Sequence, residues 1–414
     1  MKSTRRQVLQ VGLSSAAVVS LSGSMPAFLQ RFAYAEAAAD PKISNDNVLV
    51  VVQLSGGNDG LNTVIPVGND AYLKARPKIG IKDKVHKLSD ELALNPGMTA
   101  FKELYDLGKL AVINGCGYPN PNRSHFRSME IWHTANPKEY ESCGWLGHYL
   151  DHYLKGTDAP LRAANIGSEL PQALVAESAP VPSINSLEDF KVRTDASGTP
   201  DGKAAEKLIR DLSMKEAMAA SPALEFLHRQ ATNAILSADQ IRKLSAGYKP
   251  DVNYPYNSLG PTMRMIAQMI NANLGTRLFY CQTGGFDTHA NQVGGHEQVL
   301  GGLASSLAAF YKDLAAKGLA DKVTIMCFSE FGRRVEQNDS NGTDHGAAGP
   351  MFLLGGKVKG GLHGTYPSLT DLEGGDLKYN VDFRKVYATL LEKWLNADSE
   401  KVLKSKFATM GLFA

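Results

Sequence analysis

The chain has little cysteine, no excess of charge of either sign and no long apolar run. Its 414 residues include four cysteines, 44 Lys and Arg and 42 Asp and Glu. The cysteines are too few for a disulfide framework and are not spaced as a zinc ribbon or a C-x-x-C redox pair. The near-balanced charge argues against a nucleic-acid partner, which needs clustered Lys and Arg. With 43% hydrophobic and 21% charged residues, the composition is typical of a soluble globular protein.

Motifs for electron and hydride transfer are missing as well. No G-x-G-x-x-G sequence follows a predicted strand, so the dinucleotide-binding fingerprint is absent. No series of cysteines suits an iron–sulfur cluster. Oxidoreductase chemistry is therefore the weakest of the functions considered.

The N-terminus resembles a twin-arginine export signal. Arg5 and Arg6 precede a weakly apolar stretch diluted by Ser, Ala and Gly, and Ala33-Tyr34-Ala35 offers a small-x-small cleavage site. We predict a signal peptide over residues 1–35, a linker over 36–46, export by the twin-arginine translocase and a periplasmic or secreted location. The alternatives are an amphipathic terminal helix and an uncleaved membrane anchor. Cleavage after Ala35 removes four basic and no acidic residues, and leaves no transmembrane domain.

Four short apolar runs predict buried strands, and each runs into a polar or Gly-rich loop. The runs cover residues 47–54, 110–114, 277–281 and 323–328. Helical patterns over 123–132 and 299–316 alternate with them, which predicts an α/β fold: a three-layer α/β/α sandwich around a mostly parallel sheet. We predict a single domain over residues 47–414. Helical patterns over 204–215, 222–246 and 261–273 indicate a helical insertion at about 185–260.

Acids and histidines follow these strands, where ligands bind in open parallel sheets. Carboxylate oxygens mixed with imidazole nitrogens suit one or two divalent ions, zinc or manganese, whereas calcium or magnesium is favoured only if the histidines do not bind. Taken singly, each residue has an ordinary structural explanation, such as a turn. The predicted metal ligands are Asp59, Asp287, His289, Glu330, Asp344 and His345.

Ser124 is the candidate nucleophile. It lies at the predicted N-terminus of a helix, where the helix dipole and unpaired N–H groups favour negative charge. Its alternative role is that of a simple N-cap. Arg123 and Arg333 come from two strand-end loops and could clamp a tetrahedral oxyanion, or could equally form exposed ion pairs.

Five motifs occur in order and resemble those of the domain of unknown function 1501 family, over about residues 47–412. The motifs are VVQLSGGNDGLN (51–62), RSHF (123–126), GGFDTH (284–289), SEFGR (329–333) and GTDHG (342–346). The family is grouped with the alkaline phosphatase and sulfatase superfamily. The resemblance implies an alkaline phosphatase-like sandwich with two metals at the strand ends, Ser124 as nucleophile and the six ligands above.

The sequence departs from the superfamily pattern at two places. One residue, instead of the usual longer spacing, separates Asp287 from His289, and Glu330-Phe331 stands where an Asp-His pair is usual. A formylglycine-dependent sulfatase is excluded because Cys116-Gly117-Tyr118 does not supply the C-x-P-x-R sequence. The predicted function is a metal-dependent hydrolase of phosphate or related esters, small or polymeric. The alternative is a non-catalytic binding or surface protein with a structural metal site.

Overall fold

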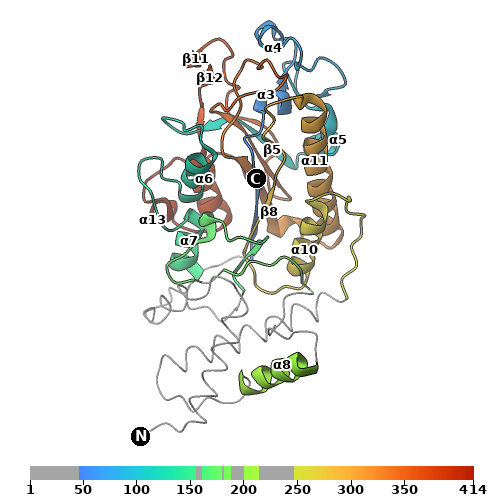
Figure 1. Ribbon diagram of the computed structural model, residues 1–414, viewed down its shortest axis with the longest axis vertical. Coiled ribbons are helices and arrows are strands. Elements are labelled where there is room, and N and C mark those ends of the chain that lie inside the picture. Colours follow the sequence, from blue (N-terminus) through green and yellow to red (C-terminus); the bar gives the residue numbers. More distant parts are fainter. Residues whose placement is uncertain (1–45, 155–160, 180, 188–199, 214–246) are drawn as a thin grey trace.

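The computed structural model describes residues 46–154, 161–179, 181–187, 200–213 and 247–414 (Figure 1). The predicted signal peptide and the predicted helix over 222–246 lie outside the described residues, as does the linker apart from Asp46. Of the predicted helical insertion, the described part includes one helix, α8 (Pro200–Ser213). Among the described residues, no helix combines the length and apolar character needed to cross a membrane.

The centre of the domain is an eight-stranded sheet in the order β10-β5-β9-β8-β1-β7-β6, with β13 also paired to β5. All pairings are parallel except those of β9, which runs antiparallel to β5 and β8. All four predicted strands are confirmed. The strands are β1 (Val48–Leu54), β5 (Leu110–Gly117), β6 (Ala163–Ile166), β7 (Leu278–Thr283), β8 (Val323–Ser329), β9 (Gly349–Gly355), β10 (Gly361–His363) and β13 (Val381–Asp382).

Strand β1 shows why the sheet is buried on both faces. All seven of its residues are buried, and it lies between β7 and β8, pairing Val52 with Cys281 on one side and Cys327 on the other. The sequences of strands in parallel sheets are continuous apolar runs because helices cover both faces of the sheet. The run predicted from the sequence therefore occupies the middle of the sheet.

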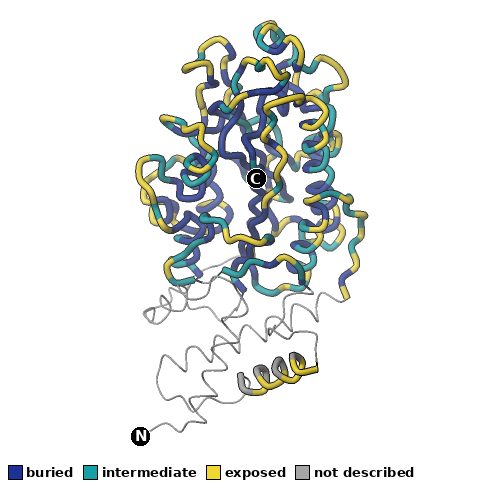
Figure 2. The backbone as a smooth tube through the Cα atoms, viewed as in Figure 1, coloured by how far each residue is buried: buried dark blue, intermediate teal, exposed yellow. Residues whose placement is uncertain are grey.

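Helices cover the two faces of this sheet as separate layers (Figure 1). One layer contains α5 (Thr99–Asp106), α10 (Gly260–Asn271) and α11 (Gln292–Ala316), and the other α6 (His125–Thr134), α7 (Trp145–Tyr149), α12 (Phe383–Thr389) and α13 (Ser399–Leu403). The deepest burial runs along the strands between the layers (Figure 2). The three-layer α/β/α sandwich is confirmed.

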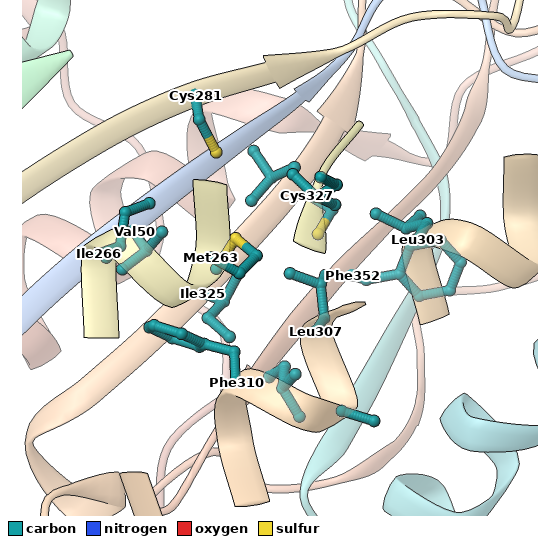
Figure 3. Packing of buried hydrophobic residues seen from close by; sticks show 14 of the residues in the cluster. Val50, Met263, Ile266, Cys281, Leu303, Leu307, Phe310, Ile325, Cys327 and Phe352 are labelled. Atoms are coloured by element: carbon teal, nitrogen blue, oxygen red, sulfur yellow. The ribbon is translucent and has the colours of Figure 1, made fainter. Parts of the chain in front are cut away.

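Alternate residues of each strand enter two different cores. Val50 and Val52 pack on the α11 side, whereas Leu49 and Val51 pack on the α6 side. Helix α11 contributes buried residues at alternating spacings of three and four, which place them on one helical face: Leu300, Leu303, Leu307, Phe310 and Leu314. Figure 3 shows this helix packed against Val50, Ile325 and Phe352 of the sheet.

Smaller elements surround the sheet. Near the carboxyl edge of β1 lie α3 (Gly60–Thr63) and α4 (Asp70–Ala75), followed by a three-stranded sheet of β2 (Val64–Pro66), β4 (Leu92–Leu94) and β3 (His86–Lys87). The hairpin β11 (Leu372–Glu373) and β12 (Asp376–Leu377) follows β10 in the chain. Short 3₁₀ segments cover Pro96–Met98, Gln172–Leu174 and Ala320–Lys322, and π segments cover Leu150–Leu154 and Leu390–Trp394.

Candidate metal centre

The carboxyl ends of β1, β5, β7 and β8 meet at one edge of the sheet. Because β9 is antiparallel to β8, the loop that enters β9 lies at the same edge as the loops that leave the parallel strands. The sheet therefore brings His125 after β5, Asp287 after β7, and His345 before β9 to one place. Ligand atoms of these three residues all lie within 4.8 Å of one another.

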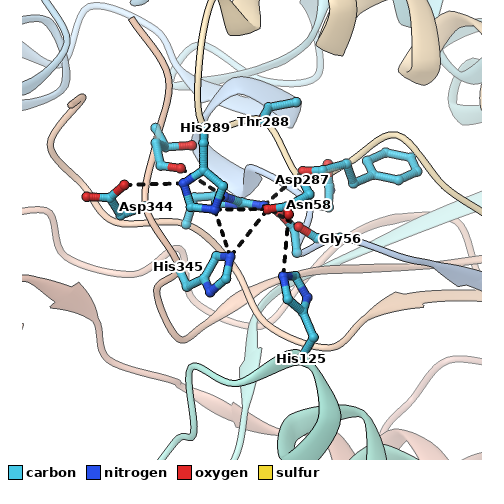
Figure 4. Close-up of polar contacts among 12 residues, drawn as sticks. Gly56, Asn58, His125, Asp287, Thr288, His289, Asp344 and His345 are labelled. Carbon is cyan, nitrogen blue, oxygen red and sulfur yellow. Dashed lines mark hydrogen bonds and ion pairs between the residues drawn. The ribbon is translucent and has the colours of Figure 1, made fainter. Parts of the chain in front are cut away.

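His289 completes the group, and Asp287 lies between the three histidines (Figure 4). The Asp287 Oδ1 atom is 3.1 Å from His289 Nε2 and 3.3 Å from His345 Nε2, and Oδ2 is 3.6 Å from His125 Nε2. The Nε2 atoms of His289 and His345 are 2.9 Å apart. His125, Asp287, His289 and His345 together form the cluster.

The other ring nitrogen of each histidine contacts a group that can only accept a hydrogen bond. His125 Nδ1 is 2.8 Å from the Glu330 carboxylate. His345 Nδ1 is 2.9 Å from the carbonyl oxygen of Arg123, and His289 Nδ1 is 3.3 Å from the Asp344 carboxylate. The Nδ1 atoms must therefore donate, which leaves a lone pair on each Nε2 when the ring is neutral.

Three lone pairs facing one carboxylate make an electron-rich site that matches a borderline divalent cation. Metal-bound histidines almost always donate their second ring N–H to a carboxylate or a backbone carbonyl, as all three do here. A tetrahedral zinc site with bonds of about 2.0–2.1 Å separates its ligands by roughly 3.3 Å, close to the spacing of Asp287, His289 and His345. The residues fit zinc or manganese.

The pKa values of the cluster agree with this assignment. Burial lowers the pKa of His345, which favours the neutral ring that binds a metal. Burial alone would raise the pKa of Asp287, but the Arg333 guanidinium that hydrogen-bonds to it lowers the pKa overall. Asp287 is thus held as a carboxylate.

Glu330 supports the cluster from behind. Its side chain is 2% exposed, and Oε1 accepts from His125 Nδ1 and from the Gly56 N–H at 2.8 Å each. Oε2 accepts from the Ser329 hydroxyl at 3.0 Å. Glu330 was predicted as a ligand; the structure places it behind His125, with its oxygens used in orienting that ring. Asp344, also predicted as a ligand, holds His289 in the same way.

Phe331 and two glycines set the position of the histidine rings. The Phe331 ring packs against His125 and His345, with centroids 4.9 and 4.7 Å away. Gly57, at φ +73°, lies so close to Phe331 that a Cβ atom would approach the ring to 2.2 Å. At Gly56, with φ +124°, a Cβ atom would meet the Asp287 backbone. The Gly-Gly pair of the first motif therefore allows the loop after β1 to pack under the cluster.

Asp59 does not join the cluster. It is fully buried as the N-cap of α3, where Oδ1 accepts from two backbone N–H groups. Its Oδ2 accepts from Arg76 Nη1 at 2.6 Å and from the Gln292 amide. Burial would raise the pKa of Asp59, but the Arg76 charge lowers it overall. The predicted ligand is instead one half of a buried ion pair that ties α3 to α4 and α11.

Arg333 is not the substrate clamp that we predicted. Its fully buried guanidinium donates to the carbonyls of Gly57 at 2.6 Å and Thr343 at 2.8 Å, and to Asp287 Oδ1 at 2.6 Å. Further acceptors are the Gly56 and Phe286 carbonyls. Because these donors are used within the protein, Arg333 fastens three strand-end loops together and positions Asp287.

Ser124 and Arg123 lie at the start of α6, next to His125. Ser124 is the exposed N-cap residue of α6, but its hydroxyl makes no capping hydrogen bond. The Arg123 side chain is 45% exposed and pairs with Asp376 of β12 at 2.6 Å. Ser124 thus keeps the exposed position expected of a nucleophile, while Arg123 pairs with a carboxylate.

His125 was not among the ligands predicted from the sequence, although the structure places it in the cluster. The available signal was its position directly after Ser124, in the same strand-end loop as other candidates. The cluster side chains are between 23% and 50% exposed. An open site of this kind can admit a substrate, whereas structural zinc sites are closed.

Comparisons with known proteins give one family match. The model of a family described as "Protein of unknown function (DUF1501)" matches residues 109–409. A comparison with curated proteins found no match.

Several solved structures are similar to the chain at low identity. PsFucS1 sulfatase from Pseudoalteromonas sp. is 11% identical, with 100% of this chain and 76% of that chain covered and a TM-score of 0.39. A protein in the alkaline phosphatase superfamily from Vibrio parahaemolyticus is 9% identical, with 98% and 80% covered and a TM-score of 0.36. Ps i-CgsB in complex with k-i-k-neocarrahexaose is also 9% identical, with 88% and 75% covered and a TM-score of 0.39.

Proposed function

The chain belongs to the DUF1501 family, and we propose that it is an exported, metal-dependent hydrolase of phosphate or related esters. One observation carries the proposal: three histidines, each fixed by an acceptor at Nδ1, direct Nε2 lone pairs at the partly exposed Asp287. His125, Asp287, His289 and His345 would hold the metal. When bound, a zinc or manganese ion would supply positive charge against the developing oxyanion.

Ser124 is the proposed nucleophile. Its hydroxyl makes no capping bond, it is exposed, and it lies at the positive end of the α6 dipole beside His125. Attack by its oxygen on phosphorus would expel the alcohol, and water would then release phosphate from the serine. Arg123 holds His345 through its backbone carbonyl.

Metal binding is tested first on the purified protein. We expect zinc or manganese to bind and to raise the melting temperature, and His125→Ala to weaken both effects. His152→Ala is the matched control, because His152 is exposed in the π segment outside the cluster. Less than about a tenth of an equivalent of bound metal, with no thermal shift on metal addition, would contradict the proposal.

Catalysis is tested with chromogenic phosphate monoesters and diesters in the presence of each metal. Ser124→Ala is expected to lower kcat by at least about a hundredfold while metal binding is retained. Hydrolysis at the wild-type rate by Ser124→Ala would rule out the serine mechanism. Metal binding without hydrolysis of any ester would favour the alternative, a binding protein with a structural metal.

Export is tested by cell fractionation. We expect the protein outside the cytoplasm when the twin-arginine translocase is present and inside when it is absent. Replacing Arg5 and Arg6 with lysine should have the same effect as loss of the translocase. Unchanged export of that variant would refute the predicted route.

A further inference from the structure

A pair of arginine side chains lies beside the cluster and has no part in the proposed mechanism. Arg123 precedes Ser124, and Arg334 follows the buried Arg333. Both reach the hairpin β11–β12 and converge on Asp376, which is only 5% exposed. Their own side chains are 45% and 37% exposed.

The contacts of this pair leave donors unused. Arg123 donates through Nε and Nη2 to Asp376 Oδ2, at 2.8 and 2.6 Å. Arg334 Nε is 3.5 Å from Asp376 Oδ1, and its Nη2 donates to the Gly374 carbonyl. Arg123 Nη2 also lies 3.5 Å from the Gly374 carbonyl oxygen. Among the described residues neither Nη1 atom has a partner, so each guanidinium retains at least the two N–H donors of Nη1.

The charge of the pair is also incompletely balanced. Both guanidinium groups pair with the one carboxylate of Asp376, and among the described residues neither forms an ion pair with a second acid. The nearby Lys378 pairs with Asp371. The two guanidinium groups and Asp376 together therefore carry one net positive charge, with at least four spare donors, at a partly exposed position. Guanidinium groups recognise carboxylate, sulfate and phosphate through paired N–H donors.

Backbone hydrogen bonds fix where Arg123 and Arg334 lie relative to the cluster. Arg123 accepts a hydrogen bond from His345 through its carbonyl, and the Arg334 N–H donates to the Asp344 carbonyl at 3.0 Å. A small pocket beside the hairpin is lined in part by Tyr118, Ala347, Asp376 and Tyr379, and also by the acid Glu373. The pocket therefore lies next to the Asp376 carboxylate that pairs with both guanidinium groups.

We propose that Arg123 and Arg334 form a second anion subsite, so that the preferred esters carry an additional oxyanion on the alcohol portion. This inference rests on the proposed function, since the first oxyanion is the ester group at the cluster. It narrows the substrate class to dianionic or polyanionic esters. Asp376 is the positioning residue that holds both guanidinium groups toward the ligand.

The test uses two non-hydrolysable probes that differ by one carboxylate, benzylphosphonate and 4-(phosphonomethyl)benzoate. With zinc supplied, the full chain is expected to bind the carboxylated probe about tenfold more tightly, as measured by calorimetry. Arg334→Gln should remove this preference without changing the affinity for benzylphosphonate. Lys312→Gln is the matched control, because Lys312 is an exposed cation paired with Glu103 on the α11–α5 side.

The possible results separate the two proposals. Equal affinity of the wild type for both probes, or a preference that survives Arg334→Gln, overturns the second subsite and leaves the ester site standing. Binding of neither probe overturns both. Arg334→Lys distinguishes paired donors from charge alone: it should recover less than half of the preference, because an ammonium lacks the planar fork.

Discussion

Glu330 should control metal affinity through His125, although it is not itself a ligand. Its carboxylate is nearly inaccessible and accepts from His125 Nδ1 at 2.8 Å. Two replacements separate its charge from its capacity to accept. Glu330→Gln can keep an oxygen in place for His125 but has no charge, whereas Glu330→Met removes the acceptor as well.

The expected magnitude follows from these contacts. Loss of a group that orients a metal-bound histidine typically costs 10- to 100-fold in affinity, or about 1.4–2.7 kcal/mol. We expect Glu330→Gln near the lower limit and Glu330→Met near the upper. Glu330→Met also leaves the buried Gly56 N–H without its acceptor, which should lower the free energy of unfolding by about 1–3 kcal/mol.

The assay is competition with a chelator of known zinc affinity, performed on protein shown to be folded by circular dichroism. A double-mutant cycle with His125→Ala identifies the route of the effect. If Glu330 acts through His125, Glu330→Met should cause little further loss once His125 has been removed. Equal losses in both backgrounds would refute the reasoning, and His152→Ala should leave the affinity unchanged.

Three further predictions concern stability. Arg76→Met leaves the Asp59 carboxylate buried without its partner and should lower the free energy of unfolding, measured in urea, by about 3–5 kcal/mol. A loss of less than about 1 kcal/mol would show that this ion pair does not stabilise the fold. Burial lowers the pKa of His296 to about 4, so as the pH falls this residue is protonated in the unfolded chain before it is protonated in the folded chain. The free energy of unfolding, measured in urea, should therefore fall by about 3 kcal/mol between pH 6.5 and pH 4. His296→Gln should reduce this fall. Gly57→Ala places a Cβ atom against Phe331 at a positive φ and should lower the free energy of unfolding by at least about 1–3 kcal/mol. Gly68→Ala is the control: Gly68 also has a positive φ, +70°, but has open space around it, so its loss of stability should reflect the backbone conformation alone.

The sequence was sufficient to predict the central strands and the sandwich. β1 and β8 are continuous apolar runs, and burial on both faces of a parallel sheet produces that pattern. β6 was missed because it has only four residues, and β9 because it contains glycine and proline, which are uncommon within strands. The antiparallel direction of β9 was also not predictable, because it depends on pairing with strands that include the distant β5.

The edge at which the site lies was predictable, but the roles of its residues were not. Asp287, His289 and His345 come together as expected, since their loops meet at the carboxyl edge. Whether an acid at this edge faces a metal or a neighbouring histidine depends on the direction of its side chain, which residue spacing does not determine. Glu330 and Asp59 carry the same charge, yet one orients a ring and the other is buried against a guanidinium.

The antiparallel placement of β9 affects how the centre can assemble. The connection from β8 to β9 starts and finishes at neighbouring strands, and Arg333 and His345 form a bridge across it. Closing this short loop costs less entropy than bringing together His125 and Glu330, which are 205 residues apart. One side of the site can therefore form as a local unit, and the distant loops after β5 and β7 then dock onto it.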